Sequence, residues 1–174
     1  LARTEQISGV PLIEVNFQES SWSSSGMKRL FDLSFSFFLL VVLSPAFLLV
    51  GLLIKISSKG PIIYSQERLG YMGKPYWIYK FRSMVVNAEA ESGPVWASDD
   101  DPRVTQLGRV LRKYRIDELP QLINVLIGDM SIVGPRPHMV EHDIKYSKLF
   151  KSFLKRHKCS PGLTGWAQVN GLRG

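Results

Sequence analysis

The chain has 174 residues, 45% of them hydrophobic, with a formal net charge of +7 and one cysteine, Cys159. This length supports one modest domain. A lone cysteine excludes an internal disulfide, and no cleavable signal peptide is recognisable, so we expect a body that faces a reducing cytoplasm.

Residues 1–26 are predicted to be the end of a preceding module followed by a linker. Ile7 to Val15 has the composition of a strand, and the serine-rich stretch after it is typical of a flexible tether. These 26 residues carry one basic and three acidic side chains, so the positive excess belongs to the rest of the chain. We expect the functional domain to occupy residues 27–174.

An uncharged run of 22 residues, Leu33 to Ile54, is long enough to cross a membrane. Ser44 and Pro45 lie at its middle, and both flanks are basic, which is typical of ends on the cytoplasmic side. Proline removes a backbone donor and disfavours helix at the residue before it. The pattern favours a re-entrant helix-break-helix, with a kinked transmembrane span as the alternative.

The next segments predict a β-hairpin and a helix. Residues 62–68 and 75–81 are strand-like and flank a turn-rich stretch, and alternation places Lys80 and Arg82 on a basic face. Apolar residues at helical spacing predict a helix over residues 107–114. The acids at 99–101 are typical of a solvated loop, and a share in a metal site is the alternative.

Two adjacent acids, Asp117 and Glu118, precede an amphipathic stretch that we expect to end at Gly128. Asp117 is predicted to be the N-cap and Glu118 to lie in the first turn, where the helix dipole favours the ionised carboxylate. Such a site suits a nucleophile or a metal ligand. The alternative is an ordinary helix start, for which these residue types are common.

Arginines are concentrated near these acids. Arg112 and Arg115 come just before them, where guanidinium groups would lower the pKa of Asp117 and could bind phosphate oxygens bidentately. The alternative is a solvated basic face.

Residues 146–158 combine an apolar stripe with five basic residues, and Lys145 directly before them is a sixth, which predicts an amphipathic interfacial helix. Each basic residue near anionic lipid would contribute about 1 kcal/mol. Nucleic acid is the rival partner. We disfavour it because the basic residues are interleaved with apolar positions.

A short motif, His138-Met-Val-Glu141-His142, matches an inverted zinc-protease pattern. The downstream chain offers only Asp143 and His157 as further ligands, without a distant acidic ligand. A zinc metalloprotease is therefore a remote alternative.

Several long motifs in a fixed order carry a resemblance to a known family. They run from about Lys28 to Gly171: KRLFD before the apolar run, YKFRSM, DPRVTQLGRVLR, DELPQLINVLIGDMSIVGPRP and PGLTGWAQVNG. The chain resembles the bacterial sugar transferases, monotopic phosphoglycosyl transferases, and among them the larger members that include undecaprenyl-phosphate glucose phosphotransferases. Relatives continue beyond the last motif, so we expect the domain to be incomplete at its C-terminus.

The resemblance implies a role for each matching residue. Asp117 would attack the β-phosphorus of a UDP-sugar, release UMP and hold the phosphosugar until undecaprenyl phosphate takes it. Glu118 would assist a Mg²⁺ site, shared with Asp117, or proton transfer. Arg112 and Arg136 would bind phosphate or substrate, and we add Arg82 and Arg115 from the basic surroundings.

We therefore expect an α+β, mainly helical fold with a re-entrant membrane helix, a small β-hairpin and amphipathic interfacial helices. The expected place is the cytoplasmic face of the bacterial inner membrane, against anionic lipids and without nucleic acid. The implied reaction begins exopolysaccharide, capsule or O-antigen synthesis. A non-catalytic membrane-anchoring module is the alternative, and formation of a homo-oligomer is left open.

Overall fold

The computed structural model describes residues 3–7, 10–14, 26–88, 101–150 and 153–171. The chain divides into two units, Leu1–Phe31 and Asp32–Gly174. The first unit contains strands β1 (Arg3–Ile7) and β2 (Val10–Glu14), paired antiparallel with Arg3 opposite Glu14. The predicted serine-rich linker lies outside the described residues.

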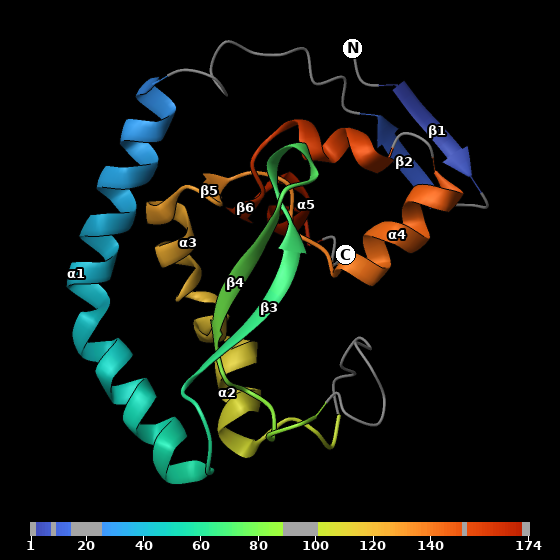
Figure 1. Ribbon diagram of the computed structural model, residues 1–174. Coiled ribbons are helices and arrows are strands. Elements are labelled where there is room, and N and C mark those ends of the chain that lie inside the picture. The colour runs from blue at the N-terminus through green and yellow to red at the C-terminus, as the bar shows by residue number, and fades with distance from the viewer. Residues whose placement is uncertain (1–2, 8–9, 15–25, 89–100, 151–152, 172–174) are drawn as a thin grey trace. The chain divides into compact units, whose positions relative to one another are not determined.

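Helix α1 (Gly26–Ser57) is long and continuous through the apolar run. The expected break at Ser44 and Pro45 is absent, although α1 is bowed near its middle (Figure 1). Pro45 cannot donate to the carbonyl of Val41, and the Ser44 hydroxyl donates to that carbonyl instead, over 2.8 Å. The helix therefore keeps its geometry across the proline, and the re-entrant placement stays a prediction.

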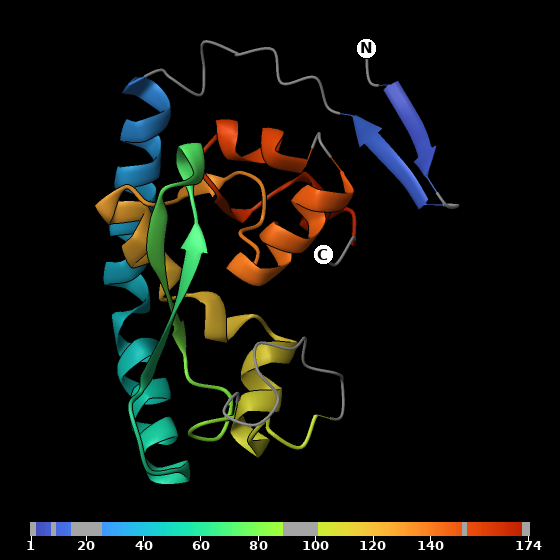
Figure 2. The ribbon, with the colours of Figure 1, turned by 45° about the vertical axis from the view of Figure 1, so that its right-hand side comes forward.

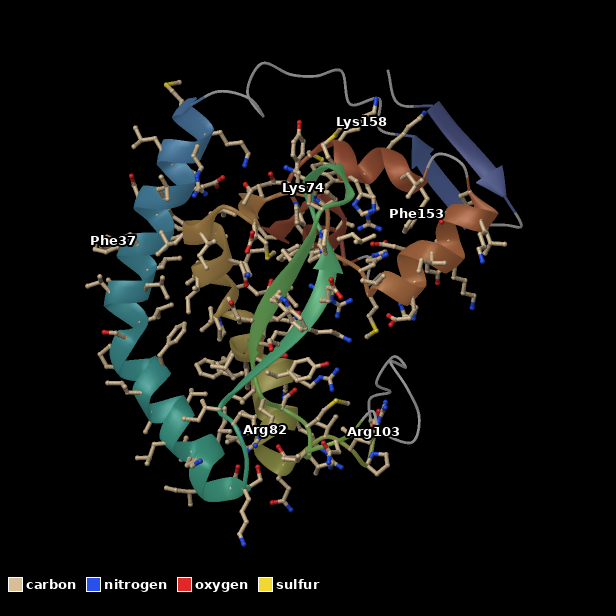
Figure 3. The ribbon with its side chains drawn as sticks, viewed as in Figure 1. Phe37, Lys74, Arg82, Arg103, Phe153 and Lys158 are labelled. Atoms are coloured by element: carbon tan, nitrogen blue, oxygen red, sulfur yellow. The ribbon has the colours of Figure 1, made fainter. Side chains whose placement is uncertain are left out.

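The two faces of α1 differ. Its inner face packs on two apolar clusters of the second unit, through Leu39, Leu40 and Leu43 on one and Phe47, Val50 and Ile54 on the other. Phe37, whose side chain points away from the rest of the second unit in Figure 3, is 63% exposed. By length and composition α1 could cross a membrane, and only 11% of its most apolar window is buried within the protein. Membrane association follows from this uncovered apolar face.

The predicted hairpin is confirmed as strands β3 (Ile63–Leu69) and β4 (Pro75–Phe81), joined through the short 3₁₀ helix η1 (Tyr71–Gly73). Ile63 pairs with Phe81, and Leu69 with Pro75. Both views place the hairpin between α1 and α4 (Figures 1 and 2). Tyr76 and Ile78 of β4 join the main apolar cluster, with α3 on the same side.

The predicted helix before the acids is α2 (Gln106–Lys113), which begins at Thr105, whose hydroxyl accepts from the amide of Gly108. The chain then forms the 3₁₀ helix η2 (Ile116–Glu118) and helix α3 (Gln121–Ile127). Asp117 is therefore not the N-cap of a helix. Gly128 ends α3 with φ of 110°, as predicted.

The C-terminal part contains β5 (Ser131–Val133), α4 (Val140–Leu149), the 3₁₀ helix η3 (Phe153–Lys158), β6 (Gly162–Thr164) and α5 (Trp166–Val169). Strands β5 and β6 are parallel. The single helix predicted over residues 146–158 is wrong, because α4 ends at Leu149 and η3 is a separate turn. Tyr146 and Phe153 bring these two elements together, with ring centroids 5.5 Å apart. The fold class, mainly helical with a small antiparallel sheet, is confirmed.

Candidate active site

A buried amide holds α3 against the hairpin. The Asn124 side chain is 0% exposed; its Oδ1 accepts from the amide of Tyr79 over 3.0 Å, and its Nδ2 donates to the carbonyl of Trp77 over 2.7 Å. These bonds join α3 directly to the main chain of β4. They fix the position of β4 relative to α3. Lys80, which follows Tyr79 in β4, faces Glu118 in this arrangement.

Three cations surround the Glu118 carboxylate. Lys80 Nζ lies 2.9 Å from Oε1, and Arg136 donates from both terminal nitrogens, over 2.7 Å to Oε1 and 3.2 Å to Oε2. Arg115 is a more distant partner, 3.7 Å from Oε2 and half exposed. Burial opposes ionisation, but Lys80 and Arg136 outweigh it and hold the pKa of Glu118 well below its usual range. Glu118 is therefore a permanent carboxylate in this site.

Asp117 is buried in a different electrostatic setting. Burial raises its pKa, with Glu118 adding to the rise and Lys80 and Arg112 opposing it. The expectation that nearby arginines and a helix dipole would lower the pKa is corrected, because desolvation dominates and no helix starts at Asp117. Among the described residues, Asp117 Oδ1 has no hydrogen-bond partner.

An unsatisfied donor accompanies this unsatisfied acceptor. Arg112 Nη1 is buried and has no acceptor among the residues that the structure describes. Unpaired buried polar atoms are costly, and their persistence at one place is typical of a site prepared for a ligand. Arg112 would favour an anion, and Asp117 a cation or an electrophile.

The two adjacent acids Asp117 and Glu118, called the dyad from here on, offer magnesium two carboxylates. In the described part of the chain, no group of three or more His, Cys, Asp or Glu residues could hold a metal ion. Magnesium is commonly bound through one or two carboxylates with the substrate's phosphates and water completing its shell. The Asp117 carboxylate, one oxygen of which is unpaired, fits that use, whereas Glu118 would have to share its oxygens with Lys80 and Arg136. Asp101, another acid considered for a metal, is bound bidentately to Arg103, and 99–100 lie outside the described residues.

Arg82, predicted to bind phosphate, performs another task. Its guanidinium donates to the carbonyls of Ser58 and Lys59, over 2.8 and 3.1 Å, and to the Ser58 hydroxyl. Figure 3 places it at the C-terminal end of α1. Gly60, with φ of 129°, permits the approach, because a Cβ there would collide with this guanidinium. Arg82 thus holds the end of α1, and its role in binding phosphate stays a prediction.

The loop that carries Arg136 is held from two sides. The Asp32 carboxylate of α1 accepts from the Ser131 hydroxyl over 2.8 Å and from the amide of Ile132 over 3.1 Å. On the other side, the guanidinium of Arg156 donates to the carbonyl of Arg136. These contacts anchor the segment between β5 and α4 independently of the ion pair between Arg136 and Glu118.

The zinc-protease motif is not built as such a site. His138 precedes α4, which begins at Val140, so the two histidines do not share a helical face. A His138 ring nitrogen lies 2.9 Å from Arg156 Nη1, and since Arg can only donate, that nitrogen accepts. An imidazole engaged by a guanidinium is poorly placed to bind zinc.

Sequence reasoning found the dyad, Arg112, Arg115 and Arg136, but missed three residues that position them. Lys80 was assigned only to a basic strand face, and Asn124 and Asp32 appeared only within motifs. An acid at the edge of an apolar run and an amide among apolar helix positions were the available signals.

Comparison with known proteins settles the family. The family model for bacterial sugar transferases matches residues 23–174. The chain belongs to the bacterial sugar transferase family. This confirms the resemblance seen in the sequence and removes the zinc metalloprotease from consideration.

Three relatives indicate what this bacterial sugar transferase resembles. It is 45% identical, over 99% of its length, to UDP-glucose:undecaprenyl-phosphate glucose-1-phosphate transferase of Escherichia coli K12, and covers 37% of that protein. It is 45% identical to the exopolysaccharide production protein PSS of Rhizobium leguminosarum, over 85% of this chain and 76% of the relative. It is 43% identical to an Aeromonas hydrophila UDP-N-acetylgalactosamine-undecaprenyl-phosphate N-acetylgalactosaminephosphotransferase, over 82% of this chain and 34% of that protein. The chain thus spans little more than a third of the length of several curated relatives.

Proposed function

We propose that this protein transfers a sugar-1-phosphate from a UDP-sugar to undecaprenyl phosphate and releases UMP. Relatives at 43–45% identity carry undecaprenyl-phosphate sugar phosphotransferase names. The observation that carries the proposal is the buried, unpaired oxygen of Asp117 beside arginine and lysine side chains. A carboxylate among cations is the arrangement that covalent phosphoryl transfer requires.

In the first half-reaction, Asp117 Oδ1 forms a bond to the β-phosphorus of the UDP-sugar. The bond from that phosphorus to the bridging oxygen breaks, and the oxygen leaves with UMP. In the second half-reaction, an oxygen of undecaprenyl phosphate attacks the same phosphorus and frees the Asp117 carboxylate. The product is a polyprenyl diphosphate sugar, and the two steps predict ping-pong kinetics.

The surrounding cations offset phosphate charge during both half-reactions. Arg112 offers an unpaired donor, and Arg136 presents its fork beside the dyad. Mg²⁺, held by Asp117 with a share of Glu118, would neutralise diphosphate charge. A proton-transfer role for Glu118 is disfavoured, because a carboxyl group held ionised by two cations is a poor proton donor.

We place the reaction at the cytoplasmic face of the bacterial inner membrane. The exposed apolar face of α1 and its basic flanks favour that surface, where a lipid-borne acceptor and a soluble nucleotide sugar can meet. The name of the Rhizobium relative supports a role in exopolysaccharide production, and we propose that the reaction is the first membrane step of that synthesis or of capsule or O-antigen synthesis. A non-catalytic anchoring module is the competing function, and the unpaired Asp117 argues against it.

The test is intact mass spectrometry of the detergent- or nanodisc-solubilised protein with Mg²⁺ and a panel of UDP-sugars. We expect a gain of one hexose-phosphate, or its amino-sugar equivalent, in wild type and none in Asp117→Asn, which keeps the size of the side chain but loses the nucleophile.

A second experiment tests the cytoplasmic placement. Inverted membrane vesicles should release UMP from added UDP-sugar, whereas sealed right-side-out vesicles should not. Absence of both adduct and UMP release would favour the anchoring module.

A further inference from the structure

Lys80 occupies a position in the site that its sequence context did not reveal. It lies near the end of β4, its side chain is 22% exposed, and its Nζ is 2.9 Å from Glu118 Oε1. It also interacts electrostatically with Asp117. A single lysine thus acts on both carboxylates of the dyad from the hairpin.

The ammonium group of Lys80 has more donors than the protein uses. Lysine carries three N–H donors, and Glu118 is its one acceptor among the described residues. Glu118 Oε1 also accepts from Arg136 over 2.7 Å, so the two cations meet at one carboxylate oxygen. The free donors of Lys80 are available to another anion in the same place.

The local balance of charge also favours an anion. Four cations surround the two carboxylates of the dyad: Lys80, Arg112, Arg115 and Arg136. This excess of positive charge is partly buried, where it is costly without counter-ions. A diphosphate would supply the missing negative charge and accept from donors that remain unused.

We propose that Lys80 binds phosphate oxygens of the sugar donor, and that Glu118 holds Lys80 and Arg136 in position while the site is empty. This inference rests on the proposed function and adds a substrate-binding residue to it. Glu118 presents two anionic oxygens to Lys80 and Arg136, much as a phosphate would. When the diphosphate enters, its oxygens take the free donors of Lys80 and compete with Glu118 for the bound one.

The competing explanation is a purely structural ion pair between the hairpin and η2. Both explanations predict lower stability when Lys80 is replaced, because Glu118 would lose a buried partner. They differ in binding. A structural pair has no direct contact with ligand, so its loss would leave the affinity of the folded protein for a diphosphate unchanged.

The experiment measures UDP affinity by isothermal titration calorimetry in EDTA, so that magnesium does not contribute. We expect Lys80→Met to weaken UDP binding by about ten- to a hundredfold, the range for one lost charge-assisted hydrogen bond. Lys80→Arg, which keeps the charge, should recover part of the loss. The matched control is Lys74→Met at the exposed tip of the same hairpin (Figure 3), which should stay within about twofold of wild type.

Glu118→Gln separates the two explanations further. We expect it to bind UDP at least as tightly as wild type in EDTA, because a competing anion has been removed. The double variant Lys80→Met/Glu118→Gln removes both charges of the pair, which protects against misfolding, and should keep the weak binding of Lys80→Met. The proposal is overturned if folded Lys80→Met binds UDP within twofold of wild type, if Glu118→Gln weakens binding as much as Lys80→Met, or if wild type shows no UDP binding at millimolar concentration.

The mass assay distinguishes failure of this inference from failure of the proposed function. If wild type forms the phosphosugar adduct and Lys80→Met forms it equally fast, the function stands and the role of Lys80 is refuted. If UDP binding depends on Lys80 but no UDP-sugar gives an adduct or UMP, the binding site stands and the transfer reaction is refuted.

Discussion

Replacing Asn124 should damage both the stability of the fold and the geometry of the site. The Asn124 side chain pairs with the amide of Tyr79 and the carbonyl of Trp77 in the buried contact between α3 and β4. Asn124→Ala would leave both main-chain groups unpaired. Each buried group left without a partner costs about 1–3 kcal/mol, so we expect the free energy of unfolding to fall by about 2–6 kcal/mol.

Thermal unfolding in detergent, followed by tryptophan fluorescence, measures this loss. For a chain of this size each kcal/mol shifts the melting temperature by about 2–4 °C, so a drop of at least about 4 °C is expected. Asn170→Ala is the matched control, since the exposed Asn170 side chain donates, among the described residues, to the carbonyl of Trp166 alone, and its loss should cost about 0.5 kcal/mol or less. The phosphosugar adduct should also form more slowly per folded Asn124→Ala molecule, because the register between Lys80 and Glu118 would relax. Equal melting temperatures for the two alanine variants would refute the assignment of Asn124 as the link between α3 and the hairpin.

Two further predictions concern residues beside the site. Arg82→Met should lower the melting temperature, because the carbonyls of Ser58 and Lys59 lose their donor, yet leave UDP affinity within about twofold; weaker UDP binding at unchanged stability would restore the phosphate-binding role. Burial first, and then Arg156 and neighbouring cations, lower the pKa of His138 to about 3, below its ordinary value of about 6.5. Since the neutral ring is favoured in the fold, its contribution to stability is complete above about pH 6.5 and is lost as the pH falls toward 3. Melting temperatures between pH 7 and 4 should therefore fall less steeply for His138→Gln, and parallel curves would contradict the assignment.

Local patterns predicted the elements that depend on local interactions. The alternating residues of the hairpin, the apolar spacing of α2 and the glycine at the end of α3 each act within a few residues, and the structure contains all three. The buried face of α3 could not be predicted in this way. The apolar spacing of Leu119, Leu122, Ile123 and Leu126 predicts a buried face that includes Ile123, but Ile123 is 38% exposed while Asn124 is fully buried. Two hydrogen bonds to β4 rotate the helix so that a polar side chain faces inward, which hydrophobic periodicity cannot predict.

In the charged site too, contacts between sequence neighbours could be predicted, whereas contacts between distant residues could not. Asp117 and Glu118 are neighbours in the sequence, so their pairing was available from the residues alone. Lys80 is 38 residues from Glu118, and Arg136 is 18 residues away on the other side, so their meeting depends on how the hairpin and β5 pack. The pKa of Asp117 depends on burial in that assembled site, which explains why a prediction from neighbouring arginines had the wrong sign.

Asp32 links the apolar helix α1 to the candidate active site. An acid in an otherwise apolar stretch would be costly beside lipid, yet Asp32 is 4% exposed and its oxygens accept from Ser131 and the amide of Ile132. Those acceptors tie α1 to β5, and β5 leads within three residues to Arg136. The position of Arg136, which donates to Glu118, is thereby set from the helix whose outer face is apolar and uncovered. If this helix enters the membrane surface as we propose, the depth at which it lies also fixes the height of Asp117 and Glu118 above the lipid.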